Sequence, residues 1–178
     1  VGPAEFKIEA FIQGSAENSP DDNLDRESAP SNISLSLKNG RFLFSLAQRL
    51  GSSKFTVKFP NAESEIQSGI AIAETGTNGS RLIPLDGFAR IKPQDSIWEI
   101  VKDGVSAVVP AKESDKKIIF KHVYSRERER FGNFIKTAEQ LRRSVIFKYS
   151  PNAGFAAELI LPKAFFAMPI KHLSLIHI

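Results

Sequence analysis

Alternation of apolar and polar residues runs through much of the chain and predicts a protein with many strands. The segment EFKIEAFI (5–12) alternates, and KFTVKFP (54–60) alternates until Pro60 stops it. Further extended segments are SGIAIAE (68–74), SRLIPLDGFARIK (80–92, broken by Pro84) and KKIIFKHVYS (116–125). Between the last two, SIWEIV and VSAVVPA flank a KDG turn. That pattern fits either the end of a helix followed by a strand or a hairpin.

The segment ISLSLKNGRFLFSLAQRLG (33–51) supports two interpretations. The Asn39-Gly40 pair is typical of a hairpin turn, but apolar residues then recur at helical spacing. These are Phe42, Leu43, Leu46 and Leu50. The spacing favours a helix from Arg41, with Gly51 as its C-cap.

A second helix is predicted over the arginine-rich segment that follows residue 125. One side carries an apolar stripe formed by Phe131, Phe134, Ile135, Ala138 and Leu141. The other sides carry Arg128, Arg130, Lys136, Arg142 and Arg143. The strands SVIFKYS and FAAELILP then form a hairpin around the turn 151–154.

Strands and helices mix without a strict βαβ rhythm, which predicts the α+β class. Residues 1–111 are expected to form one domain that contains a flexible acidic loop over 14–31. Residues 112–170 are expected to form a basic arm. The last eight residues, 171–178, resemble a translated adaptor sequence and are left out of the fold prediction.

Composition limits the chemistry that this chain can perform. The 178 residues are 42% hydrophobic and 25% charged, as in ordinary globular proteins. The chain has no cysteine, which excludes a disulfide framework, a thiolate metal site and a cysteine nucleophile. A reducing compartment, the cytoplasm, is expected. No apolar run approaches the roughly 18 residues of a membrane span.

Positive charge is concentrated late in the chain. Residues 116–148 hold ten lysines or arginines against three glutamates. Alternating charges of this kind often form a solvated face with weak ion pairs. The same side chains can also contact a nucleic-acid backbone, since Arg126 and Arg130 lie one helical turn apart.

Several kinds of catalytic site are not indicated. There is no glycine-rich phosphate loop, and no group of His, Asp and Glu has the spacing of metal ligands. We therefore predict no cofactor and no metal. His122 is a lone strand histidine, which is usually structural, and Ser150 taken alone is a turn residue.

Four segments, taken in order, resemble the repeat-processing CRISPR endoribonuclease of type I-F systems. FLFSLAQRLGSSKFTVKFPN is similar to that family's first helix and following strand, and SIWEIVKDGVSAVVPA is similar to its WLxGLRD…PVP segment. FKHVYSRERER stands where the family has a strand and an arginine-rich helix. VIFKYSPNAGFAAELIL resembles its hxhxSxxxG…FxLxI hairpin. The resemblance covers roughly residues 5–161.

The resemblance implies a ferredoxin-like domain followed by an RNA-binding arm, in a nuclease of antiviral defence. It implies binding of a stem-loop RNA, the CRISPR repeat, and metal-free hydrolysis by attack of a ribose hydroxyl. Ser150 matches the serine that positions the ribose. The RNA-binding helix corresponds to Arg126, Arg128 and Arg130, and more loosely to Arg142 and Arg143. Other subunits of a CRISPR surveillance complex are implied as partners, and no membrane.

Two departures weaken the implied catalysis. The family's general-base histidine falls in a helix that here reads Leu-Ala-Gln-Arg-Leu, with Gln48 as the catalytic position and Ala47 as the competing one. The residues that read base edges become His122 and Tyr124. Binding of the stem-loop with reduced or lost cleavage is therefore expected. The competing reading is a non-enzymatic, β-rich interaction protein, associated with a phage or a secretion system, whose basic helix is solvated.

Overall fold

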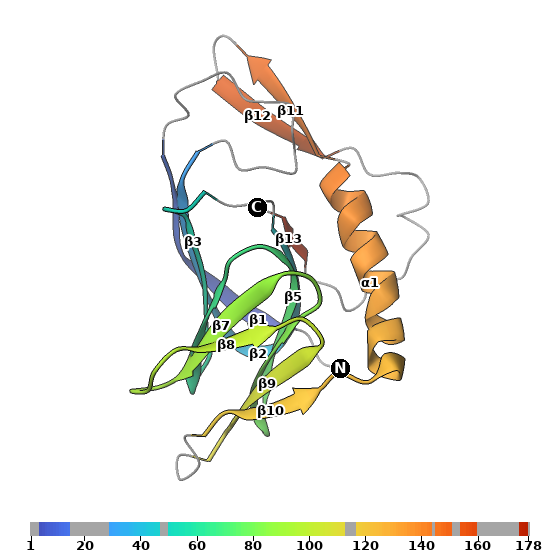
Figure 1. Ribbon diagram of the computed structural model, residues 1–178. Coiled ribbons are helices and arrows are strands. Elements are labelled where there is room, and N and C mark those ends of the chain that lie inside the picture. The colour runs from blue at the N-terminus through green and yellow to red at the C-terminus, as the bar shows by residue number, and fades with distance from the viewer. Residues whose placement is uncertain are drawn as a thin grey trace.

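The computed structural model describes residues 4–14, 29–46, 50–112, 117–143, 145–150, 154–159 and 175–177. Within these ranges the protein is mostly β, with a single helix (Figure 1). In chain order the elements are β1 (Glu5–Gln13), β2 (Ser31–Leu46), β3 (Lys54–Lys58), β4 (Ala62–Ile66), β5 (Gly69–Gly76), β6 (Gly79–Pro84), β7 (Phe88–Pro93), β8 (Glu99–Lys102), β9 (Val105–Pro110), β10 (Ile119–His122), α1 (Ser125–Arg143), β11 (Val145–Ser150), β12 (Gly154–Leu159) and β13 (Leu175–His177).

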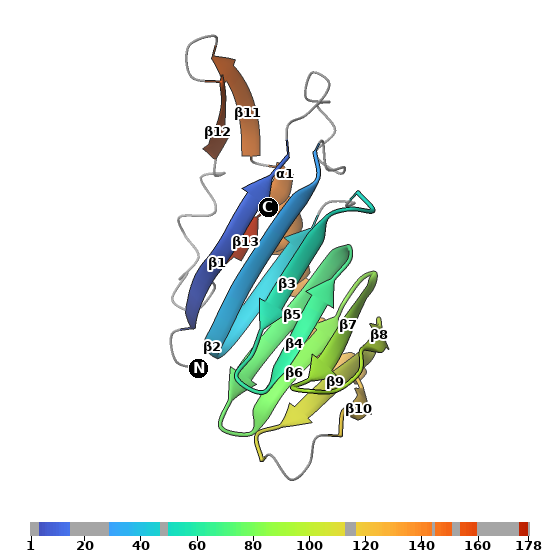
Figure 2. The ribbon, with the colours of Figure 1, turned by 90° about the vertical axis from the view of Figure 1, so that its left-hand side faces the viewer.

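The strands form an 11-stranded mixed sheet that curls into a half-barrel, and a separate hairpin of β11 and β12. The order along the large sheet is β10-β9-β6-β5-β2-β3-β4-β7-β8, and both β1 and β13 also pair with β2. Figure 2 shows the strands side by side, with α1 behind them. The pairs β2–β3 and β2–β13 are parallel and the others are antiparallel.

The long strand β2 belongs to both halves of the sheet. Its first part pairs with β1 and β3, and its second part pairs with β5 and β13. We call β1, β3, β4, β7 and β8 with the first part of β2 the first half-sheet. The remaining strands of the large sheet, with the second part of β2, are the second half-sheet. The bend between the two parts lies at Gly40, whose φ is 98°, where a Cβ atom would lie 2.6 Å from the Cα of Ala4.

The main core lies between the inner faces of the two half-sheets. Fully buried residues of the first half-sheet, such as Ile33, Phe55 and Ile91, join residues of the second, such as Phe44 and Leu82, in one cluster. A smaller cluster lies on the other face of the second half-sheet. There α1 contributes Phe131 against Leu43, Ile70, Ile72 and Ile83. The second half-sheet is therefore covered on both faces.

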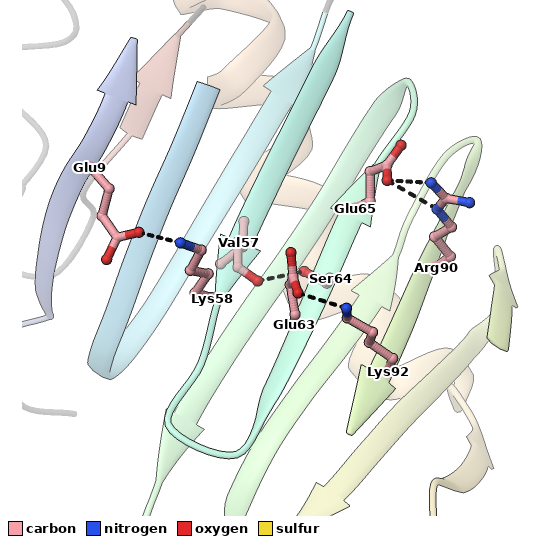
Figure 3. A network of polar contacts seen from close by, with 8 residues as sticks. All are labelled: Glu9, Val57, Lys58, Glu63, Ser64, Glu65, Arg90 and Lys92. Carbon is pink, nitrogen blue, oxygen red and sulfur yellow. Dashed lines mark hydrogen bonds and ion pairs between the residues drawn. The ribbon is translucent and has the colours of Figure 1, made fainter. Parts of the chain in front are cut away.

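The outer face of the first half-sheet carries cross-strand ion pairs (Figure 3). Glu63 on β4 lies opposite Lys92 on β7, with a carboxylate–ammonium distance of 3.0 Å. Glu65 lies opposite Arg90 in the same ladder and accepts a hydrogen bond from its Nε at 3.0 Å. Opposite charges on paired strands stabilise a solvated sheet face modestly.

One ion pair of this face spans three strands. Lys58 on β3 donates to Glu9 on β1 at 2.7 Å, across the intervening strand β2 (Figure 3). In the register, Ser36 of β2 lies beside both Lys58 and Lys7. Its short side chain leaves room for the lysine to pass over β2.

The predicted α+β, ferredoxin-like class is wrong. Between residues 4 and 112, the described ranges contain strands and no helix, whereas a ferredoxin-like domain packs helices on its sheet. The CRISPR and nuclease classification came from the resemblance that implied this fold, so we do not retain it. RNA binding is not tested by the fold. α1 packs on the same large sheet that β10 extends, rather than belonging to a helical arm appended to an α+β domain.

The helix predicted from Arg41 is also wrong, because Ser31–Leu46 is a continuous strand. Its second part carries five successive buried residues, Phe42 to Leu46, since both faces of the second half-sheet are covered. Such a run has no period of two and resembles a buried helix. The alternative prediction, a hairpin turn at Asn39-Gly40, is wrong for the same reason, because the strand continues through both residues.

Most of the other predicted elements are confirmed. The strands around 5–12, 54–60, 68–74 and 80–92 are present as β1, β3, β5, β6 and β7, and the arginine-rich segment forms α1. The late hairpin is present as β11 and β12, which pair antiparallel. The segments on either side of the KDG turn are both strands, β8 and β9, but they pair with β7 and β6 rather than with each other.

Candidate interaction surface

A bidentate ion pair joins α1 to the sheet. Arg81 on β6 donates from its two terminal nitrogens to the two carboxylate oxygens of Glu127, at 2.6 and 3.1 Å. Glu74 on β5 lies 3.6 Å from the same guanidinium and also pairs with Arg41 on β2. Three neighbouring strands thus supply the charges that hold the first turn of α1.

This network shifts the pKa of both members of the pair. The hydrogen bond from Arg81 lowers the pKa of the Glu127 carboxyl, outweighing burial, which acts in the opposite direction. Burial alone would lower the pKa of Arg81. The hydrogen bond and charge of Glu127, with the charge of Glu74, raise it above the usual value. The positive end of the α1 dipole also favours a carboxylate in this turn.

The segment between β10 and α1 is fixed by backbone hydrogen bonds. The buried Val123 donates its amide to the carbonyl of Gly104 at 2.9 Å. The carbonyl of Tyr124 accepts from the amides of Glu127 and Arg128, at 2.9 and 3.0 Å, and so begins the helix. Because Val123 points inward, its neighbours His122 and Tyr124 point outward together. Their ring centroids are 6.4 Å apart, in an edge-to-face arrangement.

Strand β10 is an exposed edge. In the described ranges it pairs only with β9, and all four of its residues are exposed. Two of them, Ile119 and Phe120, are large apolar side chains that are each 43% exposed. The other two, Lys121 and His122, are basic residue types. Between residues 117 and 126 the chain carries no acidic residue.

A shallow depression of about 420 Å³ lies beside this edge. It is lined by Arg81, Val108, Lys121, His122, Tyr124 and Glu127. Tyr124 is 75% exposed and stands at its rim. We call β10, this depression and the first turn of α1 the β10 surface.

The arginines of α1 differ in what they contact. Arg128 lies 3.5 Å from the carboxylate of Asp103, in the turn between β8 and β9. Arg126 and Arg130 are exposed, and in the described part of the chain neither has an ion pair. Their charge is therefore available to a partner.

The structure brings together only some of the residues predicted for the RNA site. His122, Tyr124, Arg126, Arg128 and Arg130 lie in or near the β10 surface. Arg142 and Arg143 are in the last turn of α1 and their side chains lie outside the described part of the structure.

The side chains of the two residues predicted for catalysis lie outside the described part of the structure. Ser150 ends β11, with its backbone opposite Gly154, and its side chain is not described. Gln48 lies outside the described ranges. Sequence reasoning missed Arg81, since nothing in strand 79–84 indicates that it meets a helix more than forty positions later.

No group of three or more His, Asp or Glu side chains that could hold a metal ion occurs in the part of the chain that the structure describes. Over the same residues, no helix is long and apolar enough to cross a membrane.

Comparison with known proteins gives little to build on. No family model matches the chain, and no curated protein matches it. Two crystal structures, at 2.50 and 1.65 Å resolution, of a "putative anti-sigma factor" from Parabacteroides distasonis ATCC 8503 are similar in part. The first is 10% identical over 84% of this chain and 70% of that chain, with a TM-score of 0.46. The second is 11% identical over 86% and 68%, with a TM-score of 0.44. We draw no conclusion from likenesses at this level.

Proposed function

We propose that this chain is a non-catalytic protein-interaction domain that binds an acidic, extended polypeptide segment at the β10 surface. The observation that carries this proposal is the character of β10: a free sheet edge whose exposed side chains are apolar and basic. We also keep a cytoplasmic location as part of this proposal, because the chain has no cysteine.

The mode of binding follows from the free edge. Along β10 the backbone groups that face away from β9 have no strand partner in the described ranges. An extended segment can add to such an edge as a further strand, taking its affinity from main-chain hydrogen bonds and its specificity from alternate side chains. Ile119 and Phe120 point to opposite faces of the sheet, so a bound strand would meet one of them on each face.

The sign of the partner's charge follows from the surrounding side chains. Lys117, Lys121, Arg126 and Arg130 are exposed around the edge, and Asp103 is engaged by Arg128. A second copy of β10 would bring the same excess of positive charge to this edge and be repelled. An acidic strand would be attracted, and its encounter rate would fall as salt increases.

RNA is the alternative partner for the same charges. Exposed arginines one turn apart on α1 could contact phosphates. Two exposed aliphatic or aromatic residues on a strand edge are better matched by the side chains of a polypeptide strand, so we favour the protein partner. RNA binding stays a prediction and is an outcome of the test below.

The test measures binding of labelled probes by fluorescence anisotropy. The probes are a peptide of alternating valine and glutamate, a matched peptide of alternating valine and lysine, and a hairpin RNA. We expect the acidic peptide to bind and the basic peptide to fail. The variant Lys121→Glu, on β10, should weaken binding at least about tenfold through like-charge repulsion. The variant Lys54→Glu makes the same charge change on the exposed residue that begins β3, in the first half-sheet, and should leave binding unchanged.

Failure of both peptides while the hairpin RNA binds would replace the proposal with the nucleic-acid reading. Failure of all three probes, or equal effects of the two lysine variants, would contradict a partner site at β10.

A further inference from the structure

We infer that the free edge of β1 is a homodimer interface, in which a second copy of this chain adds its own β1 antiparallel about a twofold axis at Ile8. This interface lies in the first half-sheet and does not depend on the partner proposed for β10.

In the described ranges strand β1 pairs only with β2, and it presents a row of apolar side chains that are partly exposed. In the register, Phe6, Ile8 and Phe11 lie beside Leu37, Leu35 and Ile33 of β2. Those three β2 residues are at most 2% exposed, whereas Phe6, Ile8 and Phe11 are 39%, 54% and 59% exposed. The row continues the inner, core-facing side of the first half-sheet past the point where the core ends. Of these three side chains, only Phe6 has an aromatic contact within the described part of the chain, edge-on to Phe42 with ring centroids 4.6 Å apart.

A β-bulge makes this row symmetric. Ile8 pairs with Leu35 and Ala10 with Ser34, so Glu9 is an extra residue in the ladder. Without it, residues 6, 8 and 11 could not share a face, because side chains alternate along a strand. The bulge absorbs one position and leaves Phe6 and Phe11 on either side of Ile8, as consecutive members of one row.

An antiparallel copy placed about Ile8 then matches every position of this row. Ile8 lies opposite Ile8 of the second copy, and each Phe6 lies opposite a Phe11 of the other chain. Aromatic and aliphatic pairs of this kind are the unit of stabilisation between strands. A twofold interface requires such self-complementarity.

Charge selects the same register. On the outer face, Lys7 and Glu9 flank Ile8, so the twofold axis sets each Lys7 opposite Glu9 of the second copy. Moving the axis to Lys7 or to Glu9 brings two like charges together. Moving it to Phe6 leaves Phe11 without an apolar residue opposite. The axis at Ile8 matches both the apolar row and the Lys7 and Glu9 charges.

The charges at this edge are suited to such a contact. Lys7 is exposed and has no ion pair in the described part of the chain. Glu9 is held at 2.7 Å by Lys58, so a second lysine would extend an alternating row of charges. A lysine and a bulge on an edge strand normally deter pairing with unrelated strands. Glu9 of a second copy is the residue that neutralises this lysine.

The symmetry allows a complementation test by sedimentation velocity over a series of protein concentrations. The unmodified chain should sediment as a dimer at the higher concentrations. Lys7→Glu alone sets two glutamates together at both ends of the axis, and Glu9→Lys alone sets two lysines together. Each variant should weaken dimerisation about tenfold or more. A mixture of the two variants pairs opposite charges at both positions and should restore the dimer.

Lys102→Glu, at the other edge of the same half-sheet, is the matched control and should dimerise normally. Circular dichroism on each variant confirms that the chain is folded, as expected for substitutions at exposed positions. A monomer at all concentrations of the unmodified chain would overturn the inference. So would dimers that persist in both single variants, or a mixture that stays monomeric.

Discussion

Arg81 of β6 and Glu127 of α1 form a two-point ion pair, with nitrogen–oxygen distances of 2.6 and 3.1 Å. The residues are 46 positions apart in the sequence. Their contact ties the only helix of the described structure to the outer face of the second half-sheet, above the cluster formed by Phe131 and Ile72. The helix in turn fixes Tyr124 and the end of β10, so this pair supports the proposed binding surface.

Removing the charge of Glu127 should therefore destabilise the fold. We expect Glu127→Gln to lower the free energy of unfolding by about 2 kcal/mol, because hydrogen bonds to charged groups contribute about 1.5–3 kcal/mol. For a chain of this size that corresponds to a fall in Tm of about 4–8 °C. Urea unfolding followed by circular dichroism measures it. Glu129→Gln, on an exposed residue of the same helix, is the control and should change stability by less than about 0.5 kcal/mol.

The same pair predicts the direction of an acid effect. The pKa of Glu127 is lowered from its usual 4.5 in the folded protein, mainly by the hydrogen bond from Arg81. The folded state therefore binds this proton less readily than the unfolded state. The contribution of Glu127 is present in full above pH 4.5 and is lost as the pH falls through the folded pKa. Unfolding measured from neutral pH downwards should show a smaller acid loss in Glu127→Gln than in the unmodified chain. An equal loss in both would contradict this role.

The bend of β2 should depend on the absence of a side chain at Gly40. Its φ of 98° is unfavourable for other residues, and an added Cβ would lie 2.6 Å from the Cα of Ala4. We expect Gly40→Ala to destabilise the protein by at least about 1–2 kcal/mol. Gly132 lies within α1 with open space around it, so Gly132→Ala should instead stabilise by about 0.5–1 kcal/mol. Thermal unfolding of the two variants in parallel tests both signs.

Local patterns predicted the elements better than their arrangement. The apolar stripe through Phe131 indicated α1, because one face of that helix is buried. The alternation that begins at Glu5 indicated β1, whose apolar row lies beside buried residues of β2. The segment from Phe42 to Leu46 was wrongly predicted as a helix, because a strand that is buried on both faces loses its alternation of apolar and polar residues. The β10 surface could be predicted only in part. His122 and Tyr124 are local to it, but Arg81 reaches it through sheet pairing, which no short pattern encodes.

If RNA is bound, the exposed arginines should account for the affinity. Each phosphate contact adds about 0.7–0.9 to the slope of log affinity against log salt. Arg126→Ala and Arg130→Ala should each reduce that slope by roughly this amount for a hairpin RNA. Arg128→Ala is the comparison, since Arg128 is already engaged by Asp103 and should change the slope less. Equal effects of all three variants would show that the ion pair does not distinguish them.

The central claim, that β10 accepts an acidic strand, is tested most directly by hydrogen exchange of the backbone amides. An added strand accepts hydrogen bonds from the β10 amides that point away from β9, so their exchange should slow when the valine–glutamate peptide is present. We expect slower exchange within Ile119–His122 and no change within Glu99–Lys102 of β8, which also lies at an edge. Peptide binding that leaves exchange in Ile119–His122 unchanged would contradict the account.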